Sequence, residues 1–134
     1  MPDQNPPSRR PPVASDRSVS RSRGRGRGGG AGYVELSCRT NYSFLEAASH
    51  PDELVTRAVE LGHESLAITD VNSLAGVVRA HVAARGLDLD PPWKIICGAR
   101  LRFEDAPSVV VWVPDRDSYA VLCRLLTTGR RRAP

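Results

Sequence analysis

The sequence lacks the short motifs that would assign a chemistry at once. It contains no P-loop, no GxSxG element and no GxGxxG element, which excludes the usual signatures of phosphate-binding loops and nucleophile elbows. Its cysteines are few, odd in number and far apart, so they form neither a CxxC pair nor a disulfide framework. We therefore expect buried, reduced thiols at the three positions, which are Cys38, Cys97 and Cys123.

Long apolar runs and metal-binding patterns are also missing. No run could form a signal-peptide core or a membrane span, so we expect a cytoplasmic protein without a membrane partner. None of the three histidines has a second ligand at metal spacing; they are His50, His63 and His81. Metal-assisted hydrolysis needs several converging ligands, whereas Asp70 is the only carboxylate at a predicted strand end in the first half. Arg39 and Arg100 are expected nearby, and fixed cations disfavour a divalent ion.

The charge is divided unevenly between two parts of the chain. Residues 1–32 carry seven Arg and two Asp, a net +5, whereas residues 33–134 carry a net −1. The first part also holds five Pro and six Gly, and its few apolar side chains cannot offset the entropy of ordering. We predict a disordered basic tail at 1–32 and a folded domain portion at 33–134. The tail is either a solvated extension without function or a weak binder of phosphate backbones, through Arg21, Arg23, Arg25 and Arg27.

Hydrophobic periodicity predicts alternating strands and helices in the folded part. Strands are expected at residues 33–39, 65–69, 93–103 and 108–113, the last apolar enough to be buried. Helices are expected at about residues 49–61, 74–85 and 115–127. The helix at 74–85 is expected to carry Val77, Val78, His81 and Val82 on its apolar stripe. Gly98, inside the third strand, predicts a bulge or a close approach. The order β-α-β-α-β-β-α favours a mostly parallel α/β sheet or part of a barrel, since four strands cannot close an eight-stranded one.

The most informative stretch is residues 61–76, LGHESLAITDVNSLAG. Gly62 is expected to end a helix and Asn72 or Ser73 to cap the next one. Asp70 follows the intervening strand, and chemistry in β/α folds collects at the carboxyl ends of strands. Asp70 is therefore the first candidate for function.

The first strand has a polar and an apolar face. The two-residue period places Val34, Leu36 and Cys38 on one face, with Leu36 and Cys38 suited to packing under helices. The opposite face, which would point into a barrel or cleft, carries Glu35, Ser37 and Arg39. Polar groups in such a place need partners or water, so this face is a second candidate site.

Three segments occur in an order that matches a known family. They are YVELSCRTNYSFLEAASHPDELVTRAVELGHESLAITDVNSLAGVVRAH, IICGARLRF and YAVLCRLLTTGRRR. Together they resemble the N-terminal PHP (polymerase and histidinol phosphatase) domain of bacterial C-family DNA polymerases, the alpha subunits of DNA polymerase III and their error-prone relatives. The runs SFLxxASHPxEL and LAITDxxSLAGVVRAH are most similar to the error-prone branch. The resemblance implies an α/β fold, a partial PHP-type β/α barrel of about four strands and three helices.

The resemblance also implies where a metal would be bound. An active PHP domain ends its first strand in His-x-His, its second in Asp-His, and has an acid two residues after a glycine on its third. The corresponding positions here are Ser37, Arg39, Asp70, Val71 and Arg100, of which only Asp70 matches. This implies a PHP domain that has lost its metal centre and any metal-dependent proofreading or phosphoesterase activity. One hypothesis is that the guanidinium group of Arg39 or Arg100 replaces the charge of the ion by donating a fork of N–H hydrogen bonds to the Asp70 carboxylate. The alternative is that both arginines point to solvent.

The implied function is the N-terminal fragment of an error-prone DNA-directed DNA polymerase, a nucleotidyltransferase of damage-induced replication and repair. The family's catalytic carboxylates and Mg²⁺ belong to a palm domain beyond residue 134, so no catalytic residue and no cofactor are expected in this fragment. DNA would be bound through the missing domains, and other replication or damage-tolerance proteins are possible partners. Two alternatives stay open: a freestanding PHP-type metal-dependent phosphoesterase, and a non-catalytic nucleic-acid-binding remnant acting through the Arg-Gly tail.

Overall fold

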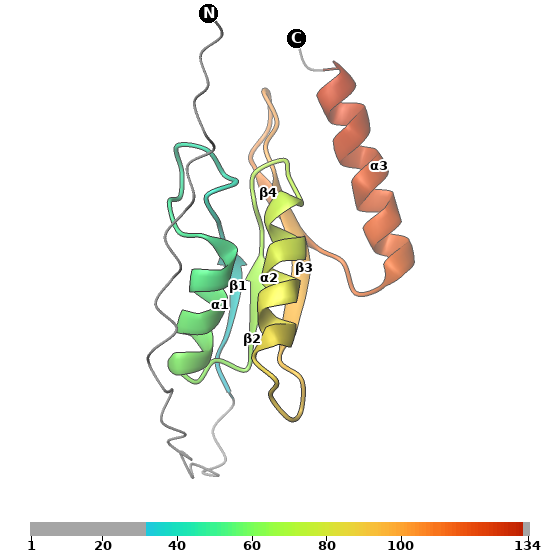
Figure 1. The fold of residues 1–134 in the computed structure, drawn as a ribbon. Helices are drawn as coiled ribbons and strands as arrows, with labels where there is room; N and C mark the ends of the chain where they lie inside the picture. The colour runs from blue at the N-terminus through green and yellow to red at the C-terminus, as the bar shows by residue number, and fades with distance from the viewer. Residues whose placement is uncertain (1–31, 133–134) are drawn as a thin grey trace, which may run out of the picture. The chain divides into compact units, whose positions relative to one another are not determined.

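A computed structural model describes residues 32–132, all within one compact unit. The expectations for the tail, including its four arginines, lie outside the described residues. The elements follow the predicted order (Figure 1). They are β1 (Val34–Cys38), α1 (Pro51–Glu60), β2 (Ser65–Ile68), α2 (Ala75–Gly86), β3 (Lys94–Leu101), β4 (Val109–Trp112) and α3 (Arg116–Arg132).

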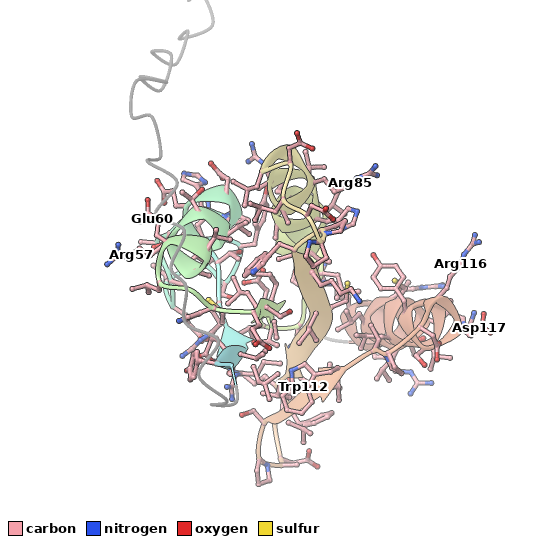
Figure 2. The ribbon with its side chains drawn as sticks, turned by 90° about the horizontal axis from the view of Figure 1, so that it is seen from below. Arg57, Glu60, Arg85, Trp112, Arg116 and Asp117 are labelled. Carbon is pink, nitrogen blue, oxygen red and sulfur yellow. The ribbon has the colours of Figure 1, made fainter. Side chains whose placement is uncertain are left out.

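The strands form one mixed sheet in the order β1-β2-β3-β4. β1, β2 and β3 run parallel, and β4 returns antiparallel beside β3, so the sheet is mostly parallel as predicted. Although β1 and β4 lie at opposite ends of this order, the Trp112 indole Nε1 of β4 donates a hydrogen bond to the Leu36 carbonyl at 2.8 Å. The sheet is therefore curled, with Trp112 on the face away from α1 and α2 (Figure 2).

The main core lies between the outer face of the sheet and the helices α1 and α2. Alternate residues of β2, Leu66 and Ile68, point into it, and Val55 of α1 packs against them. The predicted stripe on α2, Val77-Val78-His81-Val82, is wrong beyond Val77: Val78 and Val82 are 61% and 65% exposed. α2 instead buries its small residues, because these allow it to lie close to its neighbours; they are Gly76, Ala80 and Ala84.

The first strand departs from simple alternation. Its register with β2 shifts between Glu35 and Cys38. Cys38 still packs against the main core, but Leu36 is 46% exposed. The prediction that Leu36 packs under the helices is therefore wrong, because the irregularity breaks the two-residue period.

The last two elements also differ from prediction. β4 is not buried: Val109 and Trp112 are 49% and 46% exposed, because β4 pairs only with β3 among the described residues. α3 extends five residues past the predicted end at 127. It packs Leu122 against Ala99 and Leu101 of β3, in a second small cluster.

Glycines and caps explain how the elements end. Gly62 takes φ +77° just after α1, which confirms it as the residue that ends this helix. A Cβ on Gly98 would lie 2.6 Å from the Val111 carbonyl oxygen, which confirms the close approach. The prediction that Asn72 or Ser73 caps α2 is wrong, since the capping residue is Leu74 and it makes no side-chain cap bond. Ser73 Oγ accepts the Ala75 N–H at 3.1 Å, and Asn72 bonds the Arg102 backbone instead. No described helix has the length and hydropathy to span a membrane.

Candidate functional site

Asp70 lies at the carboxyl end of β2, as predicted, and its side chain is fully buried. Oδ1 accepts hydrogen bonds from the Thr40 backbone N–H and the Ser43 hydroxyl, both at 2.7 Å. Oδ2 accepts from the Thr40 hydroxyl at 2.8 Å. Both oxygens are thus occupied by donors from the segment that follows β1, and none of these donors is charged.

The same cluster extends to the start of α2. The Ser43 hydroxyl, besides donating to Asp70, accepts the Val71 backbone N–H at 3.1 Å. A Cβ on Gly76 would lie 2.4 Å from Asp70 Oδ2 and 2.8 Å from Thr40 Oγ1, so only glycine lets α2 approach this closely. Asp70 therefore joins three segments: the turn after β1, the end of β2 and the first turn of α2.

Neither arginine forms the predicted fork onto Asp70. No Arg or Lys nitrogen lies within 4 Å of the Asp70 carboxylate among the described residues, so that hypothesis is wrong. The reason is that the Thr40 and Ser43 donors already occupy both oxygens. The alternative, that both arginines point to solvent, is also wrong, since each has protein partners of its own.

Arg39 belongs to an ion-pair group on the rim. Glu46 accepts from Arg39 through Oε2 and from Arg102 through Oε1, which ties the turn after β1 to the end of β3. Hydrogen bonds from Arg102 and then Arg39 hold the pKa of the Glu46 carboxyl below its ordinary value. Arg102 is further fixed by Asn72, whose Oδ1 accepts the Arg102 backbone N–H at 2.9 Å.

Arg100 lies on the inner face of the sheet. Its Nη2 donates to Ser37 Oγ of β1 at 3.1 Å, and its Nη1 donates to Ser108 Oγ at 3.3 Å. Its Nε is buried and has no acceptor among the described residues. The backbone of Arg100 also continues the pairing of β3 with the end of β2, since its N–H donates to the Asp70 carbonyl at 3.0 Å.

The backbones of Val71 and Arg100 lie side by side as an isolated β-bridge, but the polar contacts of the predicted site residues form three groups. Ser37 and Arg100 are in contact, Asp70 and Val71 meet Ser43, and Arg39 pairs with Glu46. No group of three or more His, Cys, Asp or Glu side chains gathers as a metal-binding set within residues 32–132. The cysteines are free and half-buried, and burial raises the pKa of the Cys38 and Cys97 thiols.

Sequence reasoning missed the partners of these residues. The missed residues are Thr40, Ser43, Glu46, Asn72 and Arg102. The available signal was the polar turn Thr40-Asn-Tyr-Ser43, whose hydroxyls directly follow a strand. Which carboxylate they would bind depends on the path of the turn, and no local pattern specifies that path.

Comparison with known proteins identifies relatives of this chain. Residues 35–133 match the PHP domain family. A protein of Rhodopirellula baltica named Error-prone DNA polymerase is 55% identical over 100 residues, which is 75% of this chain and 8% of that protein. A protein of Aromatoleum aromaticum with the same name is 54% identical over 101 residues, 75% of this chain and 9% of that protein. The chain therefore spans less than a tenth of the length of these relatives.

The fold has a counterpart among solved structures. An amidohydrolase from Chromobacterium violaceum, solved with bound sulfate and no metal, superposes with a TM-score of 0.54 at 19% identity. The likeness covers 73% of this chain and 33% of that one. It confirms the expected partial barrel and, at this identity, indicates the fold alone.

Proposed function

Because this chain belongs to the PHP domain family, we propose that it is the N-terminal PHP portion of an error-prone DNA-directed DNA polymerase, with a strand-end site that is structural. Support comes from relatives of that name at 54% and 55% identity over three quarters of the chain. Nucleotide transfer, its Mg²⁺ and contact with the primer then belong to parts of a longer protein outside this chain. So do contacts with partners in replication or damage tolerance.

The structural role rests chiefly on one observation, the environment of Asp70. A divalent ion needs several oxygen, nitrogen or sulfur ligands with free lone pairs directed at one point. Here Asp70 is buried and hydrogen-bonded through both oxygens to Thr40 and Ser43. Of the other implied positions, Val71 and the two guanidinium groups offer no side-chain ligand to a cation, and the neutral Ser37 hydroxyl already accepts a hydrogen bond from Arg100. These residues do not fit a divalent metal.

The polymerase assignment is tested on the gene. We expect the reading frame to continue past codon 134 into acidic, palm-like motifs, and the purified longer protein to extend a primer with deoxynucleotides and Mg²⁺. A stop codon followed by unrelated sequence would contradict the assignment and leave a remnant, whose binding to nucleic acid would then depend on the tail.

The structural role is tested on the chain itself. Elemental analysis of the purified protein is expected to find no stoichiometric zinc, manganese or iron, and phosphoester hydrolysis is expected to stay at background. Bound metal together with hydrolysis that disappears in Asp70→Ala would instead support the freestanding phosphoesterase.

A further inference from the structure

The groove between α3 and the segment after β3 has an apolar floor. Its volume is about 620 Å³. Two of the apolar side chains that line it, Phe103 and Leu125, are 47% and 52% exposed. Apolar surface that is gathered in a groove and left uncovered is typical of sites of protein contact.

The rim of the groove carries more arginine than acid. Arg102, Arg130 and Arg132 line it, together with a single acid, Glu104. Arg102 pairs with Glu46, whereas Arg130 and Arg132 have no carboxylate within 4 Å among the described residues. Even when Glu46 is counted, three arginines face two glutamates. A segment with an apolar side chain between carboxylates would therefore complement both the floor and the rim.

The loop between α2 and β3 has this chemistry. Its sequence over residues 87–93 is LDLDPPW. Leu89 is 40% exposed and lies between Asp88 and Asp90, which are also exposed. Neither aspartate has a Lys or Arg nitrogen within 4 Å among residues 32–132. The loop thus presents one apolar side chain flanked by two acids that have no ion pair in this region.

The loop and the groove lie at opposite ends of β3 (Figure 1). The loop directly precedes Lys94, where β3 begins, and the groove is lined by Leu101, where β3 ends. Eight residues of strand separate the two ends, which corresponds to about 25 Å. The loop therefore cannot fill the groove of its own chain, whereas it can fill the groove of another copy.

We propose that the groove binds the acidic loop of a second copy of this chain. Leu89 of that copy lies against Phe103 and Leu125, and its two aspartates meet Arg130 and Arg132. Because two different surfaces are in contact, each copy retains a free loop or a free groove to which a further copy can add. One loop in one groove is a small interface, so the association is weak and reversible.

This inference goes beyond the proposed function and does not depend on it. Self-association is measured on the 134-residue chain alone, without reference to nucleotide transfer. A chain that stays monomeric would leave the polymerase assignment untouched, and a reading frame that stops would leave the self-association untouched.

The first experiment is sedimentation velocity of the full 134-residue chain at increasing concentration. We expect the average mass to rise continuously and to pass beyond that of a dimer. Sodium chloride is expected to weaken the association, because it screens the attraction between aspartate and arginine. Nonspecific association of a chain with a net charge of +4 would instead strengthen with salt, because salt then screens the repulsion between copies. A strengthening with salt, or a monomer at every concentration, overturns the proposal.

A loop variant tests the acidic side of the contact. Asp88→Asn, Leu89→Ser and Asp90→Asn are combined, which removes the apolar side chain and both charges from an exposed loop. We expect this variant to weaken self-association at least tenfold. Its control combines Asp52→Asn and Glu60→Gln, which removes two acids from exposed positions of α1, and is expected to change the association less than twofold.

A groove variant tests the other side. Leu125→Glu replaces part of the apolar floor by a charge that repels the loop, and we expect it to weaken self-association at least tenfold. Val82→Glu makes the same change on α2, at a position that is 65% exposed, and is expected to change the association less than twofold. Circular dichroism confirms that each variant is folded.

The loop variant and Leu125→Glu are finally mixed. Leu125→Glu retains the loop and the loop variant retains the groove, so one contact can form between them and no further copy can add. We expect a 1:1 dimer at concentrations where each variant alone is monomeric, a result that does not depend on the solubility of the unchanged chain. A mixture that stays monomeric overturns the proposal. A loss in the loop variant alone would also overturn it by showing that the loop binds elsewhere, for example to the basic residues 1–32, and a loss in Leu125→Glu alone would show that the groove takes another segment.

Discussion

At the scale of single residues, Asp70 is a strand-end carboxylate whose two oxygens are both held by protein donors. It is fully buried, but its charge is stabilised by one backbone N–H and two hydroxyls. Hydrogen bonds to an ionised acceptor are stronger than those between neutral groups. The residue that most suggested catalysis from the sequence thus has protein donors on both of its carboxylate oxygens.

Replacing Asp70 by Asn keeps the shape but removes the charge and turns one oxygen into an NH₂ donor. That donor faces either the Thr40 hydroxyl, or the Thr40 N–H and the Ser43 hydroxyl. We expect Asp70→Asn to lower the free energy of unfolding by about 1–3 kcal/mol, the usual effect of an unsatisfied buried polar group. Urea denaturation followed by circular dichroism measures it. Asp105→Asn, in the exposed turn before β4, is the matched control and should change stability by less than about 0.5 kcal/mol. Equal effects in the two variants would contradict the role of Asp70.

Two glycines in helices provide a second test with an internal control. Ala has a higher helix propensity than Gly by about 1 kcal/mol, so both substitutions would stabilise the chain if packing did not matter. Gly129→Ala, where a Cβ meets nothing within 4 Å, is expected to do so. Gly76→Ala would place its Cβ 2.4 Å from Asp70 Oδ2 and is expected to destabilise by about 1–3 kcal/mol, as overpacking does. If thermal or urea unfolding showed both variants to be stabilised, the tight packing at Gly76 would be disproved.

At the scale of elements, the sequence predicted the order of the strands and helices better than the contacts between them. Strands and helices were found in the expected sequence because periodicity and turn residues such as Gly62 act locally. The predictions of which face of α2 is buried and that β4 is buried were wrong, because burial depends on what packs against each element. In the site, Asp70 could be found from its position after a strand, whereas its bonds to Thr40 and Ser43 depend on the three-dimensional path of a turn.

The ion pairs of Glu46 join elements that are distant in sequence, and they predict a pH dependence. Its pKa is lowered in the folded chain by Arg102 and Arg39. Because the folded pKa is depressed, the stability that the Glu46 ion pairs contribute is present above the ordinary pKa of 4.5. That stability is lost as the pH falls through the folded pKa. We expect Glu46→Gln to flatten the loss of stability between about pH 5 and pH 3, measured as the urea midpoint at each pH.

The control for this element is a second ion pair on α1. Glu60 pairs with Arg57 one helical turn away, and such a local pair does not join separate elements. Glu60→Gln should leave the pH profile of the urea midpoint close to that of the unchanged chain. A profile that flattens equally in both glutamine variants would show that the ion pairs of Glu46 affect the pH dependence of stability no more than a local pair on one helix does.

At the scale of the whole described region, apolar surface remains uncovered on several elements. Trp112 of β4 and Val121 and Leu125 of α3 are 46%, 55% and 52% exposed. Leu125 also lines a groove of about 620 Å³ between α3 and the segment after β3. An edge strand and a partly apolar helix face promote association when nothing covers them.

We therefore expect the isolated chain to be poorly soluble or partly molten, with strong binding of the dye ANS and a broad thermal transition. Leu125→Lys removes apolar surface from α3 and should lower ANS fluorescence and raise the soluble fraction. Thr128→Lys adds the same charge at an exposed position of that helix and should have the smaller effect, because it leaves the apolar side chain in place. A sharp, reversible two-state melt of the unchanged monomer with little ANS binding would contradict this expectation, since it would show that four strands and three helices suffice for a stable domain.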